Sequence, residues 1–115
     1  MKRPTVTCEA FDVVVVPFPF TDRLTSKRRP ALVLSTASFN TASGHAVMAM
    51  ITSARHSSWP LDVAIQTLQS AGLPAASCVR MKLFTLDLRL VIRKAGTLHE
   101  DDVKRVREAL VQLLR

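Results

Sequence analysis

The chain has 115 residues, enough for one domain with a hydrophobic core but few enough for dimerisation to add useful stability. Hydrophobic residues make up 48% of it and the mean hydropathy is +0.19, which excludes a disordered, tail-like protein. Its 16 basic and 9 acidic residues give a formal charge of +7, which favours a polyanionic partner such as nucleic acid. Prolines or charges interrupt every apolar run, so the sequence predicts no transmembrane helix, no signal peptide and a cytoplasmic location.

Cysteine and histidine positions indicate no metal site. Cys8 and Cys78 lie far apart in the sequence and are expected to be free thiols in a reducing compartment. The three histidines are scattered and show no metal-ligand spacing. We therefore predict neither a metal nor another cofactor.

Two apolar strands flank a polar, basic loop between residues 11 and 35. The first, Val13–Val16, is continuously apolar and β-branched, which predicts a strand buried on both faces. Pro30 biases the backbone of Arg29 towards an extended conformation. The second strand, Ala31–Leu34, is therefore expected to begin with a guanidinium group at its mouth.

A third strand, His45–Ile51, follows and is apolar on both faces. We assume the simplest antiparallel hairpin between the second and third strands, with Ser35 opposite Ala46. This register brings Arg29 across from Thr52, whereas a slip of one residue would turn every side chain over.

The rest of the chain predicts short strands and one long helix. We expect turn-rich connectors at 36–44 and 67–74, strands at 61–65, 76–86 and 91–95 (the last closed by Gly96), one helical turn at 87–90 and a helix from Glu100 to Leu114. The apolar face of that helix would comprise Val103, Val106, Leu110, Leu113 and Leu114. Together these elements predict a mainly β fold, a small SH3-like barrel with a C-terminal helix. We expect a single domain over residues 1–115, with residues 1–9 as a loose N-terminal arm.

The stretch between residues 11 and 35 resembles the MazF/PemK family of toxin endoribonucleases. That family has the pattern G-D-V, a hydrophobic stretch with F-x-P, a Gly/Ser/Lys-rich loop, and then R-P before a hydrophobic strand. The matching residues here are Asp12-Val13, Pro17-Phe18-Pro19, Lys27-Arg28-Arg29-Pro30 and Ala31 to Ser35, while Phe11 replaces the family's Gly. The resemblance continues through Ile51-Thr52-Ser53, Gly72-Leu73, Ser77, Lys82 to Asp87 and the final helix, and so covers nearly the whole chain from Glu9 onward.

The resemblance implies a catalytic pair, Arg29 and Thr52, and cleavage of RNA by its own 2′-hydroxyl to give 2′,3′-cyclic phosphate and 5′-hydroxyl ends. Arginine suits this chemistry because its planar fork donates two aligned hydrogen bonds to a phosphate whose charge builds up, without a metal. The structural alternative is that Arg29 is a surface cation paired with Asp22 or Asp62. Arg28 is the nearest competitor, because adjacent residues of an extended chain point to opposite sides.

The sequence does not identify the residue that would transfer the proton during cleavage. Some relatives of the PemK branch carry V-R-x-D, which supplies an acidic group, but this sequence reads Val79-Arg80-Met81-Lys82. A lysine near the position of that Asp argues against an Asp-dependent mechanism here. His56 is another candidate for this role, although a histidine in a loop is more often simply solvated.

Further basic and aromatic residues are candidates for RNA binding. The predicted RNA-binding set is Lys27, Arg28, Ser53, Arg55, Arg80 and Lys82. Arg80 and Lys82 share one face of their strand by the two-residue period, and Ser53 is alternatively the cap of a turn. Trp59, Phe18 and Phe20 stand near cations, which suits stacking of single-stranded bases. The alternatives are solvated charges for the cations and core or dimer contacts for the aromatics.

The resemblance also implies partners. These are a single-stranded RNA substrate, a second copy in a homodimer, and a cognate antitoxin that is usually acidic and partly disordered. Two other functions stay open, because a fold does not fix a function. One is a CcdB-like toxin that binds DNA gyrase without chemistry, and the other is an SH3-like module that holds RNA without cutting it.

Overall fold

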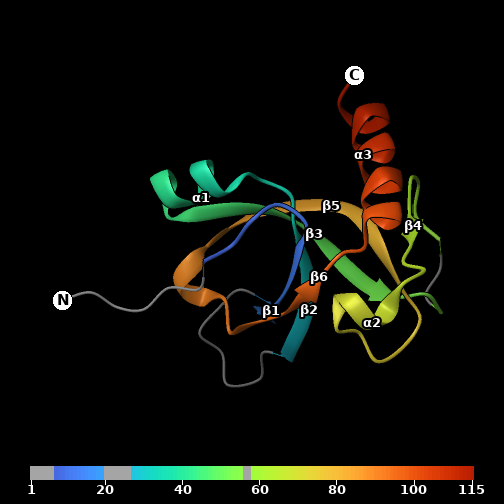
Figure 1. The fold of residues 1–115 in the computed structure, drawn as a ribbon, viewed down its shortest axis with the longest axis horizontal. Coiled ribbons are helices and arrows are strands. Elements are labelled where there is room, and N and C mark those ends of the chain that lie inside the picture. The colour runs from blue at the N-terminus through green and yellow to red at the C-terminus, as the bar shows by residue number, and fades with distance from the viewer. Residues whose placement is uncertain (1–6, 20–26, 56–57) are drawn as a thin grey trace.

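The computed structural model describes residues 7–19, 27–55 and 58–115. Its strands are β1 (Asp12–Phe18), β2 (Lys27–Val33), β3 (His45–Ser53), β4 (Val63–Ala64), β5 (Ser77–Asp87) and β6 (Arg93–Thr97). Its helical elements are α1 (Ala37–Ser43), α2 (Leu68–Ala71), the 3₁₀ turn η1 (Leu88–Leu90) and α3 (Glu100–Leu114). The strands form one antiparallel sheet in the order β4-β5-β3-β2-β1-β6, which curls into a half-barrel beside α3 (Figure 1). The predicted mainly β fold with a C-terminal helix is confirmed.

Strand β1 lies at the centre of two apolar clusters, one on each face of the sheet. Val13 and Val14 are both fully buried, and because successive side chains alternate they belong to opposite clusters. The cluster around Val13 also takes in Val106 of α3 and Ala71 of α2. The expectation of a strand buried on both faces is therefore correct.

The connector expected over residues 36–44 is instead a short helix, α1. Thr36 is its N-cap, and the Thr36 hydroxyl accepts a hydrogen bond from the Phe39 backbone N–H at 3.3 Å. Gly44 ends the helix with a φ of 73°, in the left-handed region that glycine adopts without strain. The residues that suggested turns are thus the caps of one helix.

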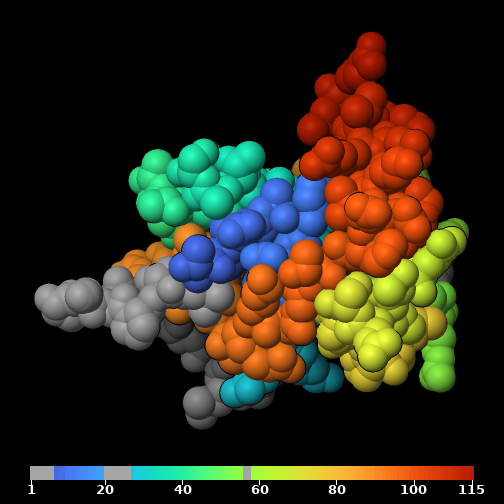
Figure 2. Space-filling model, viewed as in Figure 1, coloured from blue at the N-terminus to red at the C-terminus, as the bar shows by residue number. Residues whose placement is uncertain are grey.

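Two glycines allow α2 to approach β6 closely, and one of them, Gly96, does not lie where the sequence suggested. A Cβ added to Gly72 would meet the Ala95 carbonyl oxygen at 2.2 Å, and one added to Gly96 would meet the Ser70 oxygen at 2.3 Å. Gly96 is therefore inside β6 rather than beyond its end, and residues 67–74 include helix α2. The surfaces of α2 and β6 adjoin in Figure 2.

Helix α3 has the predicted bounds, but its apolar face is buried only in part. Val106 and Ala109 are buried, with Val103 and Leu110 packed beside them. Leu113 and Leu114 are 39% and 72% exposed, because the C-terminal end of α3 projects away from the sheet (Figure 1). Of the helices in the described ranges, none combines the length and apolar character that crossing a bilayer requires.

The N-terminal arm expected over residues 1–9 is described only from Thr7, and residues 1–6 lie outside the described residues. Cys8 is buried, and its carbonyl oxygen accepts a hydrogen bond from the Asn40 amide at 3.0 Å. The Glu9 backbone N–H donates to the Asp12 carboxylate at 2.9 Å. The chain is therefore held against the sheet from Cys8 onward.

Asp102 joins α3 to the segment that leads into α2. Its carboxylate is fully buried and accepts hydrogen bonds from the backbone N–H groups of Gln66, at 3.1 Å, and Thr67, at 3.0 Å. Arg105 supplies a third partner, an ion pair one turn along the helix. The carboxylate therefore satisfies two backbone donors, in the segment between β4 and α2, that no helix or strand would satisfy.

We expect Asp102→Ala to lower the free energy of unfolding, measured by urea denaturation, by at least about 1–3 kcal/mol, the usual cost of leaving a buried polar group without its partner. Asp101→Ala is the matched control, because the Asp101 side chain is 73% exposed in the same helical turn. It should cost no more than the ~0.3–1 kcal/mol typical of a charge at a helix N-terminus. Equal losses in the two variants would show that the Asp102 contacts carry no stability.

Candidate active site

The hairpin of β2 and β3 has the predicted register. Ala31 pairs with Met50, Leu32 with Ala49 and Val33 with Met48. Two residues further towards the open end of the hairpin, this register places Arg29 opposite Thr52. Both residues line one cavity of about 250 Å³.

The cavity has cationic walls over an apolar base. It is lined by Phe18, Arg29, Met50, Ile51, Thr52, Arg80 and Lys82. Three of these side chains are cations and none is a carboxylate, so the described lining favours an anion. Arg80 and Lys82 both line it, although the pairing of β3 with β5 is irregular at this point. Ala49 of β3 pairs with Leu83, whereas the next residue, Met50, pairs with Arg80.

Arg29 and Arg80 differ in how their charge is compensated. In the described part of the chain no ion pair involves Arg29, whose side chain is exposed. Arg80 instead donates two hydrogen bonds to Asp62, from Nε to Oδ1 at 3.2 Å and from Nη2 to Oδ2 at 2.9 Å. Asp62 is therefore the partner of Arg80 and not of Arg29, and Asp22, the other proposed partner of Arg29, lies outside the described residues.

Asp62 is the group at this site that the sequence did not single out as functional. Burial pushes the pKa of Asp62 upward, but the hydrogen bonds from Arg80 and from the Trp59 backbone N–H outweigh it and leave the pKa below its ordinary value. Asp62 is consequently a carboxylate at neutral pH. The pairing of Asp62 with Arg80 is a tertiary contact between β5 and the turn before β4. The spacing of these residues in the sequence does not indicate it.

Cys78 lies directly across the β3–β5 ladder from Thr52. Burial, reinforced by the nearby Asp62 carboxylate, raises the pKa of the Cys78 thiol above its ordinary value. A neutral, buried thiol is a poor nucleophile, so Cys78 is not a candidate for the attacking group.

The other predicted RNA-binding residues lie outside the cavity. Lys27 and Arg28 are exposed on β2, opposite Phe18 and Pro17 of β1. The Ser53 hydroxyl accepts a hydrogen bond from the Arg55 backbone N–H at 3.2 Å, as expected if Ser53 caps a turn. Arg55 is exposed beyond the end of β3. His56 and Phe20 lie outside the described residues.

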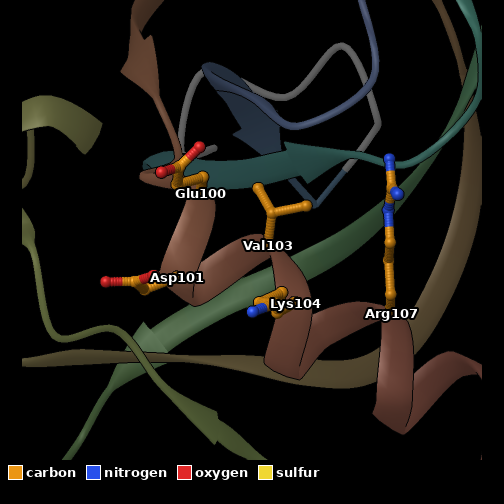
Figure 3. Close-up of a pocket in the computed structure, with 5 residues that line it drawn as sticks. All are labelled: Glu100, Asp101, Val103, Lys104 and Arg107. Atoms are coloured by element: carbon orange, nitrogen blue, oxygen red, sulfur yellow. The ribbon is translucent and has the colours of Figure 1, made fainter.

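A second hollow, of about 390 Å³, lies along α3 and is a different kind of surface. Its lining residues all come from that one helix: Glu100, Asp101, Val103, Lys104 and Arg107 (Figure 3). Two acids and two bases offset one another, and among the described residues no second element contributes a group. This hollow offers nothing for chemistry, and within the described ranges no cluster of three or more His, Cys, Asp or Glu side chains could hold a metal ion.

A sequence model of one protein family, the PemK-like, MazF-like toxin of type II toxin–antitoxin systems, matches residues 9–114. The chain belongs to this family. The match extends over nearly the whole chain and confirms the resemblance drawn from the motifs. Among curated protein sequences, none matches the chain significantly.

Solved structures of toxins from this family resemble the present one. MazF from Deinococcus radiodurans has 28% sequence identity and a TM-score of 0.74, covering 95% of this chain and 97% of that one. MazF in a MazE–MazF complex from the same organism has 26% sequence identity and a TM-score of 0.76, covering 95% of this chain and 97% of that one. MazF-mt6 of Mycobacterium tuberculosis, at 19% identity and a TM-score of 0.71 over 88% and 93% of the two chains, supports the fold alone.

Phe11 stands where the family's pattern has Gly, and its backbone shows why glycine suits that position. Its φ is 72°, in the left-handed region, which costs a residue with a side chain about 1–3 kcal/mol. The phenyl ring offsets part of this cost, because it packs against the apolar cluster and lies 5.2 Å from the Arg107 guanidinium. The departure from the family pattern is therefore accommodated at a position outside the cavity.

The depressed pKa of Asp62 predicts a pH-dependent contribution to stability. Because the folded-state pKa lies below the unfolded-state value, the Arg80 ion pair stabilises the fold at neutral pH, and this stabilisation is lost as the pH falls through the folded pKa. We expect the free energy of unfolding to fall more steeply in the wild type than in Asp62→Asn between about pH 5 and pH 2. Urea denaturation across this range measures it. Parallel curves for the wild type and Asp62→Asn would contradict the prediction.

Proposed function

We propose that this protein is a metal-independent, sequence-specific endoribonuclease toxin that cleaves single-stranded RNA, in particular mRNA. The observation that carries the proposal is the meeting of Arg29 and Thr52 in one cationic cavity of a chain that belongs to the MazF/PemK family. A toxin that only binds gyrase has no need for this pair.

The RNA's own 2′-oxygen bonds to the adjacent phosphorus as the bond from that phosphorus to the 5′-oxygen of the next nucleotide breaks, which gives 2′,3′-cyclic phosphate and 5′-hydroxyl ends. Solvent water takes the proton of the 2′-hydroxyl, and a proton from solvent completes the 5′-hydroxyl. Negative charge builds up on the equatorial phosphate oxygens as the new bond forms, and Arg29 donates hydrogen bonds to them. Thr52 orients the same phosphate through its hydroxyl and does not act as a nucleophile. Arg29 suits this role better than Arg80, since it has no carboxylate partner in the described part of the chain.

Cations around the cavity hold the rest of the RNA backbone. Arg80 and Lys82 bind phosphates beside the scissile one, and the exposed side chains of Lys27, Arg28 and Arg55 bind flanking phosphates. Ser53 supports the end of β3 through its turn hydrogen bond. Such contacts set register and affinity, and their strength falls with salt concentration.

Two protein partners belong to the proposal. One is a cognate antitoxin, as in the MazE–MazF complexes of Deinococcus radiodurans that this fold resembles. An acidic antitoxin segment would bind the cationic cavity and exclude RNA. The other is a second copy of the chain, because a homodimer of two small barrels lengthens the RNA-binding groove.

We expect Arg29→Ala to lower the single-turnover rate of RNA cleavage by about 10²–10³, the usual loss when a donor to a developing charge is removed. Thr52→Val keeps the shape and the β propensity but deletes the hydroxyl, so it should also slow cleavage while the fold survives. If both groups serve one transition state, the double variant should be much less impaired than the product of the two effects.

Arg28→Ala is the control for the choice of arginine. It should weaken RNA binding in a salt-dependent way, with a smaller effect on the cleavage step at saturating protein. A greater loss in Arg28→Ala than in Arg29→Ala would reverse the assignment. RNA binding by the wild type without cleavage would favour the non-catalytic RNA-binding module.

A single deoxyribose on the 5′ side of the scissile phosphate should abolish cleavage and leave binding largely intact, because the attacking hydroxyl is missing. The assay is run in EDTA with the unmodified RNA as its control, and mapping of the product ends identifies the cyclic phosphate. Cutting of the deoxy substrate would show that water or a side chain attacks. Loss of cleavage of the unmodified RNA in EDTA, restored by a divalent ion, would contradict the metal-independent mechanism.

A further inference from the structure

Beside the cavity, one carboxylate holds a tryptophan and an arginine together. Asp62 Oδ2 accepts the Trp59 backbone N–H at 3.0 Å, and the Asp62 N–H donates to the Trp59 carbonyl at 3.1 Å. The same carboxylate accepts both hydrogen bonds from Arg80. Leu61, inside this turn, has a φ of 66°, a strained conformation for a residue with a side chain. The surrounding contacts therefore impose one shape on the turn.

The indole ring stands against two cations of the cavity wall. Lys82 Nζ lies 4.7 Å and Arg80 Cζ 5.8 Å from the ring centroid. Both residues also line the cavity that contains Arg29. A nucleotide whose phosphate occupies that cavity would therefore have its neighbouring base within reach of the Trp59 ring.

Trp59 does not serve the described core. The ring is 41% exposed and packs into neither apolar cluster of the described residues. An exposed aromatic ring flanked by cations is the arrangement that binds single-stranded nucleic acid, where each stacked base contributes to affinity and any base can be accepted. Its fixed turn also lowers the conformational entropy lost on binding.

We propose that Trp59 is the stacking platform for one unpaired base next to the scissile phosphate, and that Asp62 is the positioning residue that fixes both the platform and Arg80. This proposal rests on the proposed RNA cleavage and names a subsite for it. Stacking on Trp59 places the nucleotide, and the Arg80 guanidinium, held by Asp62, faces the phosphate of that nucleotide.

Trp59 is the only tryptophan of the chain, so its fluorescence reports directly on the subsite. The probe is a single-stranded RNA that spans a mapped cleavage site and carries deoxyribose at the scissile position. We expect binding of this RNA to quench the fluorescence. Replacing one base beside the scissile phosphate by an abasic residue should remove the quenching and weaken binding about 5- to 150-fold, whereas abasic residues elsewhere should have smaller effects.

Trp59→Ala should weaken binding of the intact RNA by the same factor, and the abasic replacement should then cause no further loss, because the two partners of one contact are not additive. Trp59→Phe should restore part of the affinity, which excludes misfolding as the cause. Asp62→Asn should reduce the quenching and weaken binding of the intact RNA more than that of the abasic RNA. Phe39→Ala is the matched control, because Phe39 is 46% exposed on α1 and does not line the cavity.

The outcomes separate the two proposals. Normal RNA binding and cleavage by Trp59→Ala, with equal effects of every abasic position, would overturn the stacking platform and leave the nuclease intact. An equal loss of binding by Asp62→Asn for intact and abasic RNA would overturn the role of Asp62 in positioning the Trp59 platform, and no loss for either RNA would overturn its positioning of Arg80 as well. Absence of RNA binding and cleavage by the wild type would overturn the proposed function and the subsite with it.

Discussion

Asn40, in the short helix α1, is 1% exposed, and its amide decides how the closed end of the β2–β3 hairpin is built. Its nitrogen donates to the carbonyls of Cys8 and Ser35, and its oxygen accepts from the Ser35 hydroxyl. That hydroxyl in turn accepts the Val47 N–H at 2.8 Å. Both faces of β2 and β3 are apolar here, so burial alone would tolerate a slipped register. The Asn40 network excludes the slip, and Arg29 and Thr52 meet at the other end as a consequence.

The distribution of ion pairs decides which cations at this cavity of a +7 chain keep an uncompensated charge. Four carboxylates form ion pairs with cations: Asp12 with Lys94, Asp62 with Arg80, Asp87 with Arg89 and Asp102 with Arg105. Of these four cations, only Arg80 lines the cavity. Arg29 and Lys82 have no such partner among the described residues, although both line the cavity. An anion in the cavity therefore meets charge that the folded chain has not already neutralised.

Those features that depend on local pattern could be predicted from the sequence. The β-branched run Val13–Val16 predicted a doubly buried strand. The hairpin register was an assumption of the simplest pairing, and the structure has that register. Thr36 and Gly44 were misread as turn residues because a cap and a turn use the same amino acids, and only the buried Asn40 distinguishes them. Asp62 was considered only as a partner of Arg29, because its pairing with Arg80, eighteen residues along the chain, is a tertiary contact. The predicted grouping of Arg29 with Thr52 identified only one wall of the cavity.

The charge balance of the cavity also bears on how the chemistry would proceed. Lys82 stands near the position where some relatives have an acid, and the described lining contains no carboxylate, so no carboxylate base is at hand there. Asp62 is a weak candidate for that role, because hydrogen bonds from Arg80 occupy both of its oxygens and its lowered pKa makes it a poorer proton acceptor. The cations of the lining instead favour stabilisation of the charge that forms during attack, with solvent water accepting the proton of the 2′-hydroxyl. The arrangement therefore supports electrostatic stabilisation, with Arg29 as its centre, more directly than acid–base catalysis by a paired carboxylate.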